Sequence, residues 1–331
     1  MTTLLDRLDS RPAPADAATA PTTATPAQRL RATMAAARVS FTWMGTRKSL
    51  DRDQKARAAE AFGAEGRSLS AGKKLLDTGH SAFRAVTAIR GKVDAYWKGT
   101  SLPYPEPGVR LIKHDAVEPF AAAMVDLRTE LDDAVAHLDR HYAELVRAAR
   151  DRLGSLFNPA DYPETLVGLF GVEWSFPSVE PPEYLVQLAP GLYEAERARV
   201  AARFEEAVQL AERAFLDEFA RLVGHLTERI SGTGEDGQPR VFRDSAVGNL
   251  AEFFERFRTL NVRSNDQLDA LVAEAQRAVR GVTARDLRDG PALREAVAAR
   301  LSQVQTSLDA LLVERPRRRI LRQAAAPGKS S

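Results

Sequence analysis

Residues 117–157 read VEPFAAAMVDLRTELDDAVAHLDRHYAELVRAARDRLGSLF, and this stretch decides the fold class. Its apolar residues recur at alternating spacings of four and three, which is typical of a helix with one apolar seam. The seam residues are Phe120, Met124, Leu127, Leu131, Ala134, Leu138, Leu145, Ala149 and Leu153 or Leu156. We expect one long helix over about 114–157, because Pro119 falls in the first turn, where proline is tolerated.

A second run of the same kind lies between about residues 192 and 230. Its apolar residues are Val200, Phe204, Val208, Leu210 or Ala211, Phe215, Phe219, Leu222, Leu226 and Ile230. Because the Pro-rich residues 158–191 separate the two runs, the sequence predicts an antiparallel hairpin of long helices over 114–231, with 158–191 as its tip. The contacts expected across it join Leu127, Leu131 and Leu138 to Leu210, Phe215, Phe219 or Leu222.

The segments around this hairpin predict smaller elements. Residues 1–26 hold four prolines among Ala and Thr, which favours a disordered tail. Residues 27–113 are expected at the base of the hairpin, with strand-like stretches at 39–44 and 109–112 paired in a small sheet. Helical patterns at 245–260, 265–280 and 291–313 are expected to pack on the hairpin within 240–313, before a basic disordered tail at 314–331. The predicted fold is therefore mainly α and elongated, with a minor β element.

Composition narrows the class of protein. The chain has 331 residues, of which 44% are hydrophobic and 28% charged, and this balance is typical of folded proteins. It has no cysteine, which excludes disulfides, thiolate zinc sites and thiol nucleophiles. No apolar run approaches the roughly 18 residues of a membrane span, and the first residues do not resemble a secretory signal. A cytoplasmic location without membrane contact is expected.

Two motifs are compatible with a chemical role, and each has a simpler interpretation. His137 and His141 are four residues apart, so one helix face presents both imidazoles. A metalloprotease needs a glutamate after the first histidine, and Leu138 stands there, so a metal-dependent enzyme is only an alternative. The segment from Gly232 to Gly237 has the glycine spacing of a dinucleotide-binding loop, but it follows a predicted helix instead of a strand. We therefore expect no enzyme, cofactor or metal.

The strongest charge signal is near the C-terminus. Residues 315–331 carry six basic residues and no acid, whereas the whole chain has a net charge of only +2. The arginines are Arg315, Arg317, Arg318, Arg319 and Arg322. Such a cluster neutralises phosphates of a nucleic acid or docks on an acidic partner, and no interleaved aromatic residue favours base stacking. Aromatic residues elsewhere, Trp43, Trp97, Tyr162 and Trp174, are interpreted as structural anchors.

Several short segments resemble a known family. They are residues 41–50 (FTWMGTRKSL), Leu102-Pro103 followed by 108–112 (GVRLI), Leu156-Phe157, Asp161-Tyr162-Pro163 and Leu169-Phe170. In order and spacing these are similar to a helical family catalogued as a domain of unknown function, found in bacteria, phages and mobile elements. The resemblance covers about residues 38–260. It departs from the family pattern at Thr46, where a basic residue is expected directly after the glycine.

Members of that family are often encoded near MoxR-like AAA+ ATPases, which implies an adaptor or a substrate of such a machine. The family supplies no catalytic residues. The sequence therefore predicts a non-enzymatic helical adaptor or assembly subunit that acts through protein–protein contacts or self-association, with an AAA+ ATPase as the partner that the resemblance implies. The alternative is a nucleic-acid-associated protein of a phage or mobile element that uses the Arg-rich tail.

Overall fold

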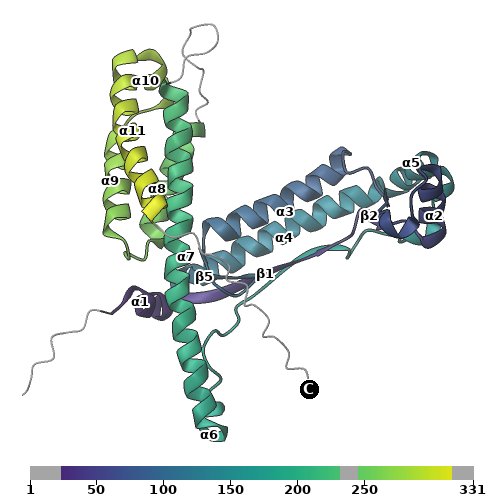
Figure 1. The fold of residues 1–331 in the computed structure, drawn as a ribbon, viewed down its shortest axis with the longest axis horizontal. Coiled ribbons are helices and arrows are strands. Elements are labelled where there is room, and N and C mark those ends of the chain that lie inside the picture. Colours follow the sequence, from purple (N-terminus) through teal and green to yellow (C-terminus); the bar gives the residue numbers. More distant parts are fainter. Residues whose placement is uncertain (1–23, 232–244, 315–331) are drawn as a thin grey trace, which may run out of the picture.

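In the computed structural model, residues 24–231 and 245–314 are described, and they form two regions joined at a steep angle (Figure 1). The first region, the bundle, contains α7 (Pro190–Ser231), α8 (Ser245–Leu260), α9 (Asp266–Val279), α10 (Ala284–Asp289) and α11 (Pro291–Glu314). The second region, the arm, contains α3 (Ser81–Gly99), α4 (Val117–Arg140) and α5 (Tyr142–Leu153) along a sheet. The fold is mainly helical, as the sequence predicts.

The predicted pairing of the two long helices is wrong. Helix α4 packs on α3 and on strand β6 (Phe170–Ser175), and α7 packs on α1 (Pro26–Thr33), α8 and α11. Leu131 therefore lies in the arm core, whereas Phe219 lies in the bundle core. Both seams are buried, but each is covered by helices other than the partner predicted for it.

The predicted helix over 114–157 and its Pro-rich tip also need correction. The helix is interrupted at His141, whose N–H bonds to the carbonyl of Leu138 at 3.0 Å, so that α4 and α5 are separate helices. Residues 158–191 are not a tip, because they contribute β6 to the central sheet and α6 (Leu185–Leu188) beside the start of α7. The helices predicted at 245–260, 265–280 and 291–313 are confirmed as α8, α9 and α11. Helices α8 and α11 pack on α7, whereas α9 packs on α11 and α8.

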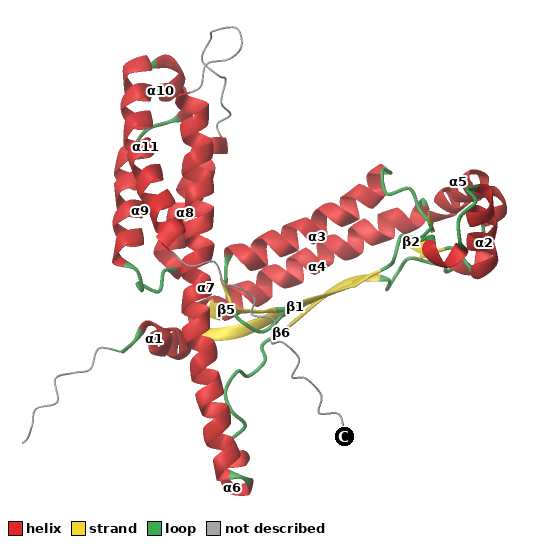
Figure 2. Ribbon diagram, viewed as in Figure 1, coloured by secondary structure: helices red, strands yellow, loops and turns green. Residues whose placement is uncertain are grey.

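The sheet has four antiparallel strands in the order β4-β5-β1-β6 (Figure 2). The first half of β1 (Met34–Trp43) pairs with β5 (Val109–Lys113), from Met34 opposite Lys113 to Arg38 opposite Val109. Its second half pairs with β6, and β4 (Leu102–Pro103) flanks β5. Both predicted stretches lie in this sheet, but the predicted pairing between them is wrong. Residues 109–112 pair with 35–38, and residues 39–43 pair with β6.

Both faces of β1 and β5 are buried where the two regions meet. Met34 and Leu111 belong to the bundle core, whereas Ala37 and Ile112 belong to the arm core. Because successive side chains of a strand point to opposite faces, this short sheet separates the two cores and is shared by them.

Smaller elements complete the described part of the chain. At the far end of the arm lie α2 (Arg52–Ala61) and a two-stranded ribbon of β2 (Arg47–Ser49) and β3 (Gly72–Lys74). Short 3-10 turns cover Gly66–Ser68, His114–Ala116, Gly154–Leu156 and Pro159–Asp161. Helix α1 begins with a capping box in which Thr25 and Gln28 each bond the other's backbone N–H. No helix in the described ranges has both the length and the apolar character needed to cross a membrane.

The predicted tails and one motif fall largely outside these ranges. Of the tail predicted at 1–26 only the last three residues are described, and of the tail at 314–331 only Glu314. The glycine motif between Gly232 and Gly237 lies outside the described residues as well.

Candidate functional site

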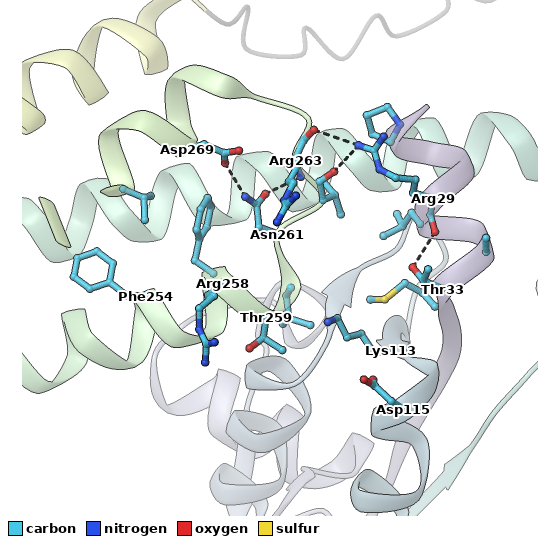
Figure 3. Close-up of a pocket in the computed structure, with 18 of the residues that line it drawn as sticks. Arg29, Thr33, Lys113, Asp115, Phe254, Arg258, Thr259, Asn261, Arg263 and Asp269 are labelled. Carbon is cyan, nitrogen blue, oxygen red and sulfur yellow. Dashed lines mark hydrogen bonds between the residues drawn. The ribbon is translucent and has the colours of Figure 1, made fainter. Parts of the chain in front are cut away.

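A cleft of about 830 Å³ lies between α1, the end of β5 and the loop that joins α8 to α9 (Figure 3). Its volume is in the range of roughly 300–1,000 Å³ that is usual for small-molecule sites. Part of its wall is apolar and is formed by Leu30, Met34, Phe254, Phe257, Leu260 and Val272. The cleft therefore has the volume, and a wall that is partly apolar and partly polar, that a small-molecule site needs.

Arg29 connects the two sides of this cleft. Its Nη2 atom donates hydrogen bonds to the carbonyls of Val262 at 3.1 Å and Arg263 at 3.3 Å, and its Nη1 atom donates to Ala24 at 2.6 Å. All three acceptors are neutral carbonyls, and no described carboxylate lies within ion-pair distance of this guanidinium. Arg29 thus fixes α1 against the loop, and none of these three contacts supplies a negative charge.

The loop itself is held in one conformation. Asn261 donates from Nδ2 to Asp269 at 2.7 Å and accepts at Oδ1 from the backbone N–H of Arg263 at 2.9 Å. Arg263 has φ = +50°, the only positive φ of a non-glycine residue within the described ranges. Such a conformation costs about 1–3 kcal/mol and persists where the surroundings fix it, often at functional sites. Here the Asn261 side chain and the Arg29 guanidinium provide that fixation.

The charges around the cleft are unequal. Four cationic side chains line it, from Arg29, Lys113, Arg258 and Arg263, against two carboxylates, from Asp115 and Asp269. Arg258 is paired with the exposed Glu255 at 2.6 Å, and Asp269 accepts from Asn261. Neither Lys113 nor the Arg263 side chain has an ion-pair partner among the described residues. The cleft therefore favours a negatively charged ligand.

A second group of charged residues lies at the far end of the arm. The Asp161 carboxylate is 2.6 Å from both Lys48 Nζ and Lys73 Nζ, and Lys73 also donates to the carbonyl of Leu156 at 2.6 Å. The Asp161 and Lys73 side chains are only 2% and 5% exposed. Hydrogen bonds from Lys48 and then Lys73 hold the pKa of Asp161 below its ordinary value, against the opposing effect of burial.

This ion-pair cluster brings together two of the segments that carry the family resemblance, 41–50 and 161–163. Beside it, Tyr162 donates from its hydroxyl to the carbonyl of Leu75 at 3.0 Å and stacks on Phe157 with ring centroids 5.0 Å apart. The cluster therefore fastens the β2–β3 ribbon to the segment that follows α5, which is a structural role.

The ribbon nevertheless carries more positive charge than Asp161 neutralises. Arg47 stands opposite Lys74, and Lys48 stands opposite Lys73. Like charges directly opposite each other destabilise a strand pair. Arg47 and Lys74 are exposed, and no carboxylate among the described residues pairs with them. The ribbon thus presents an uncompensated basic surface.

The predicted aromatic anchors all lie in or against the arm core. Trp97 is 9% exposed, and Trp43, Tyr162 and Trp174 are half-buried. Trp43 meets Phe170 edge-on at 4.9 Å, and the Arg128 guanidinium lies 5.1 Å from the ring centre of Trp174. The five predicted arginine contacts between Arg315 and Arg322 lie outside the described residues.

The two predicted histidines have a third neighbour that the sequence did not reveal. The rings of His137 and His141 are 5.0 Å apart, and His80 lies 5.4 Å from His141. His80 accepts from the backbone N–H of Ala82, and His137 contacts Arg140 at 3.0 Å. In the described part of the chain no three His, Asp or Glu side chains are arranged to hold a metal ion.

The start of α7, together with α6, forms a third surface that sequence reasoning missed, here named the α6–α7 end. It projects beyond the rest of the molecule with α6 beside it (Figure 1). Four apolar side chains are exposed there: Tyr184 at 64%, Val186 at 47%, Leu188 at 78% and Leu192 at 51%. These side chains belong to the Pro-rich segment and the helix start that the sequence predicts as the tip of the hairpin and the beginning of its second helix.

The cleft residues come from three segments distant in sequence, so no local motif indicates them. Comparison of the chain with protein-family models, with curated proteins and with solved structures finds no match.

Proposed function

We propose that this chain is a non-enzymatic, cytoplasmic adaptor or assembly subunit that acts through protein–protein contacts. The observation that carries the proposal is the α6–α7 end, where four apolar side chains are exposed on α6, at its N-cap and at the start of the projecting α7. Scattered exposed apolar residues are normal on a protein surface, but a contiguous group of large ones marks an interaction site.

The occupant that this surface fits best is a second copy of the same surface. The charges at the start of α7 are satisfied within the helix, because Glu194 pairs with Arg197 and Glu196 with Arg199. Two copies therefore bring together apolar side chains without net repulsion, and a twofold axis makes such a surface self-complementary. An AAA+ ATPase is the other partner considered, and only the family resemblance supports it.

The test is the mass of the protein in solution, together with its scattering profile. We expect the intact protein to have a multiple of the 36.3 kDa chain mass. The double variant Leu188→Glu with Leu192→Glu should reduce it to the monomer. Val167→Glu is the matched control, because Val167 is 61% exposed but lies in the arm. A monomer of 36.3 kDa at all concentrations contradicts self-assembly.

The adaptor form of the proposal has its own test. If the protein is a monomer, an AAA+ ATPase should co-purify with the intact chain and the Val167→Glu control, but not with the double variant. If such a partner co-purifies equally with all three proteins, the α6–α7 end is not the contact surface.

One observation favours a nucleic-acid-associated function as a second candidate. The β2–β3 ribbon carries the unpaired cations Arg47 and Lys74 at the exposed end of the arm. A two-stranded ribbon fits the major groove of DNA, and exposed cations bind phosphates. This candidate differs from the one based on the sequence, because the cations lie in the folded arm instead of the C-terminal tail.

A salt series separates these possibilities. DNA binding is measured for the intact chain, for a deletion of residues 314–331, and for Arg47→Gln with Lys74→Gln. If the ribbon binds phosphates, the double variant weakens binding and lowers the slope of log affinity against log salt by about 2. If only the deletion lowers this slope, the C-terminal tail makes the phosphate contacts. Absence of binding at low salt removes the nucleic-acid candidate.

A further inference from the structure

The cleft beside α1 combines two chemically different ends. In Figure 3, Phe254 lies on one side and Arg29 on the opposite side, with Arg258 and Asn261 between them. Lys113 lies along the lower margin, near Asp115. An apolar or planar group therefore fits against the phenylalanine side, while an anionic group fits against the basic side.

The positive charge of the cleft is only partly compensated from within the described structure. Arg29 contacts only carbonyl oxygens, and Lys113 and Arg263 have no ion-pair partner among the described residues. Lys113 is half-buried as a residue, and its ammonium group has no ion-pair partner among the described residues. A bound anion supplies that missing counter-charge.

The loop and the helix that line the cleft are also preorganised, since hydrogen bonds within the protein already hold them in place. The Asn261 turn fixes the left-handed Arg263, and Arg29 fixes the loop against α1. A site whose groups are already held loses less conformational entropy on binding. The strained backbone and the unpaired cations are thus two independent observations at the same place.

We propose that this cleft binds a small organic phosphate with an apolar or aromatic part, of the size of a nucleoside monophosphate. The phosphate lies against Lys113 and the arginine side, and the apolar part lies against Phe254. This proposal does not depend on the protein–protein function, since the cleft is separate from the α6–α7 end.

The test is isothermal titration calorimetry of the full chain with AMP, adenosine, inorganic phosphate and ribose 5-phosphate. AMP should bind most tightly, because it alone occupies both ends. Lys113→Gln should weaken AMP binding by about fivefold, since it removes one nearby cation. Asp115→Asn should tighten it by about threefold, since it removes a nearby anion. The matched control is Lys55→Gln, a half-buried lysine of α2 without an ion pair in the described structure.

Opposite effects of the two cleft variants, with no effect of the control, support the proposal even if overall stability changes slightly. Several results overturn it. These are adenosine or inorganic phosphate binding as tightly as AMP, equal effects of Lys113→Gln and Lys55→Gln, and no AMP binding with a Kd of about 1 mM or tighter.

Discussion

The bundle and the arm bury their residues in different ways. The bundle core is a stack of helices around an aromatic cluster, in which Phe219 lies parallel to Phe253 at 5.1 Å and Phe215 meets Phe257 edge-on at 5.0 Å. The arm core is a narrow layer between two helices and a sheet, and its outer end is closed by the buried ion pair of Asp161 and Lys73. Helical periodicity indicates most of the residues that enter the first core, whereas the second core also depends on strand pairs and charges that meet across long sequence separations.

The largest effect is expected in the bundle core. Phe219 is fully buried and stacked on Phe253, so Phe219→Ala should lower the free energy of unfolding by about 4 kcal/mol. All three tryptophans belong to the arm, so tryptophan fluorescence reports the arm, while far-UV circular dichroism reports all helices. The dichroism transition should therefore shift more than the fluorescence transition. Equal shifts would mean that the two regions unfold as one unit.

A slightly smaller effect is expected in the arm core. Leu131 is fully buried between α4 and its neighbours, so Leu131→Ala should lower the free energy of unfolding by about 3 kcal/mol. The adjacent Asp132 is exposed, and Asp132→Ala should change it by no more than about 0.5 kcal/mol. Denaturant titration followed by tryptophan fluorescence measures both. Equal, small effects would contradict the arm core described above.

The ion pair at the end of the arm gives a pH-dependent prediction. Because the pKa of folded Asp161 lies below its unfolded value of about 4, its contribution is complete above that value and is lost as the pH falls through the folded pKa. Asp161→Asn leaves Lys73 buried without its counter-charge and should cost about 2 kcal/mol at neutral pH. The variant should also lose less stability than the intact protein on acidification, as followed by tryptophan fluorescence.

Asp132→Asn is the control for this experiment, since Asp132 is exposed. It should follow the intact protein at every pH. An Asp161→Asn variant with an unchanged acid profile would show that the ion pair does not stabilise the arm.

The smallest expected effect is the coupling free energy between one substitution in each core, and it tests directly whether the two cores are separate. Leu131 and Phe219 belong to different cores and share no packing partner, so the double variant should be destabilised by the sum of the single effects within about 0.5 kcal/mol. A helical hairpin that joins α4 to α7 requires a larger coupling. A double-mutant cycle measured by denaturant unfolding decides between these arrangements.

The sequence predicts burial better than it predicts partners. The seam around Leu131 correctly indicates a buried face. Such a face can be covered by α3 or by α7, and periodicity does not distinguish them. In the structure it is covered by α3, which is nearer in sequence. The C-terminal helices at 265–280 and 291–313 were predictable because their apolar spacing and their start signals, Asn265-Asp266 and Pro291, are local. Strand β6 was not placed, because its partner β1 lies more than a hundred residues away in the chain.

The candidate sites show the same limit. The contact of Lys48 with Asp161 spans 113 residues, and no local pattern indicates it. Similarly, Arg29 reaches Val262 and Arg263 across more than 230 residues, so the cleft is a product of tertiary packing. The exposed leucines of the α6–α7 end lie in and beside the Pro-rich segment 158–191, which the sequence predicts to be the tip of a hairpin and not an exposed surface beside α7.

The shared sheet has a mechanical consequence. Leu111 and Ile112 are neighbours in one strand, yet Leu111 packs in the bundle core and Ile112 in the arm core. Helix α4, with 24 residues, extends for about 36 Å, and α7, with 42 residues, for about 63 Å. Strands β1 and β5 pack on both faces, so a force applied to the far end of the arm reaches the bundle through packed strands and not through a flexible linker. If the proposed partners bind at the β2–β3 ribbon and at the α6–α7 end, the shared sheet connects the two binding surfaces.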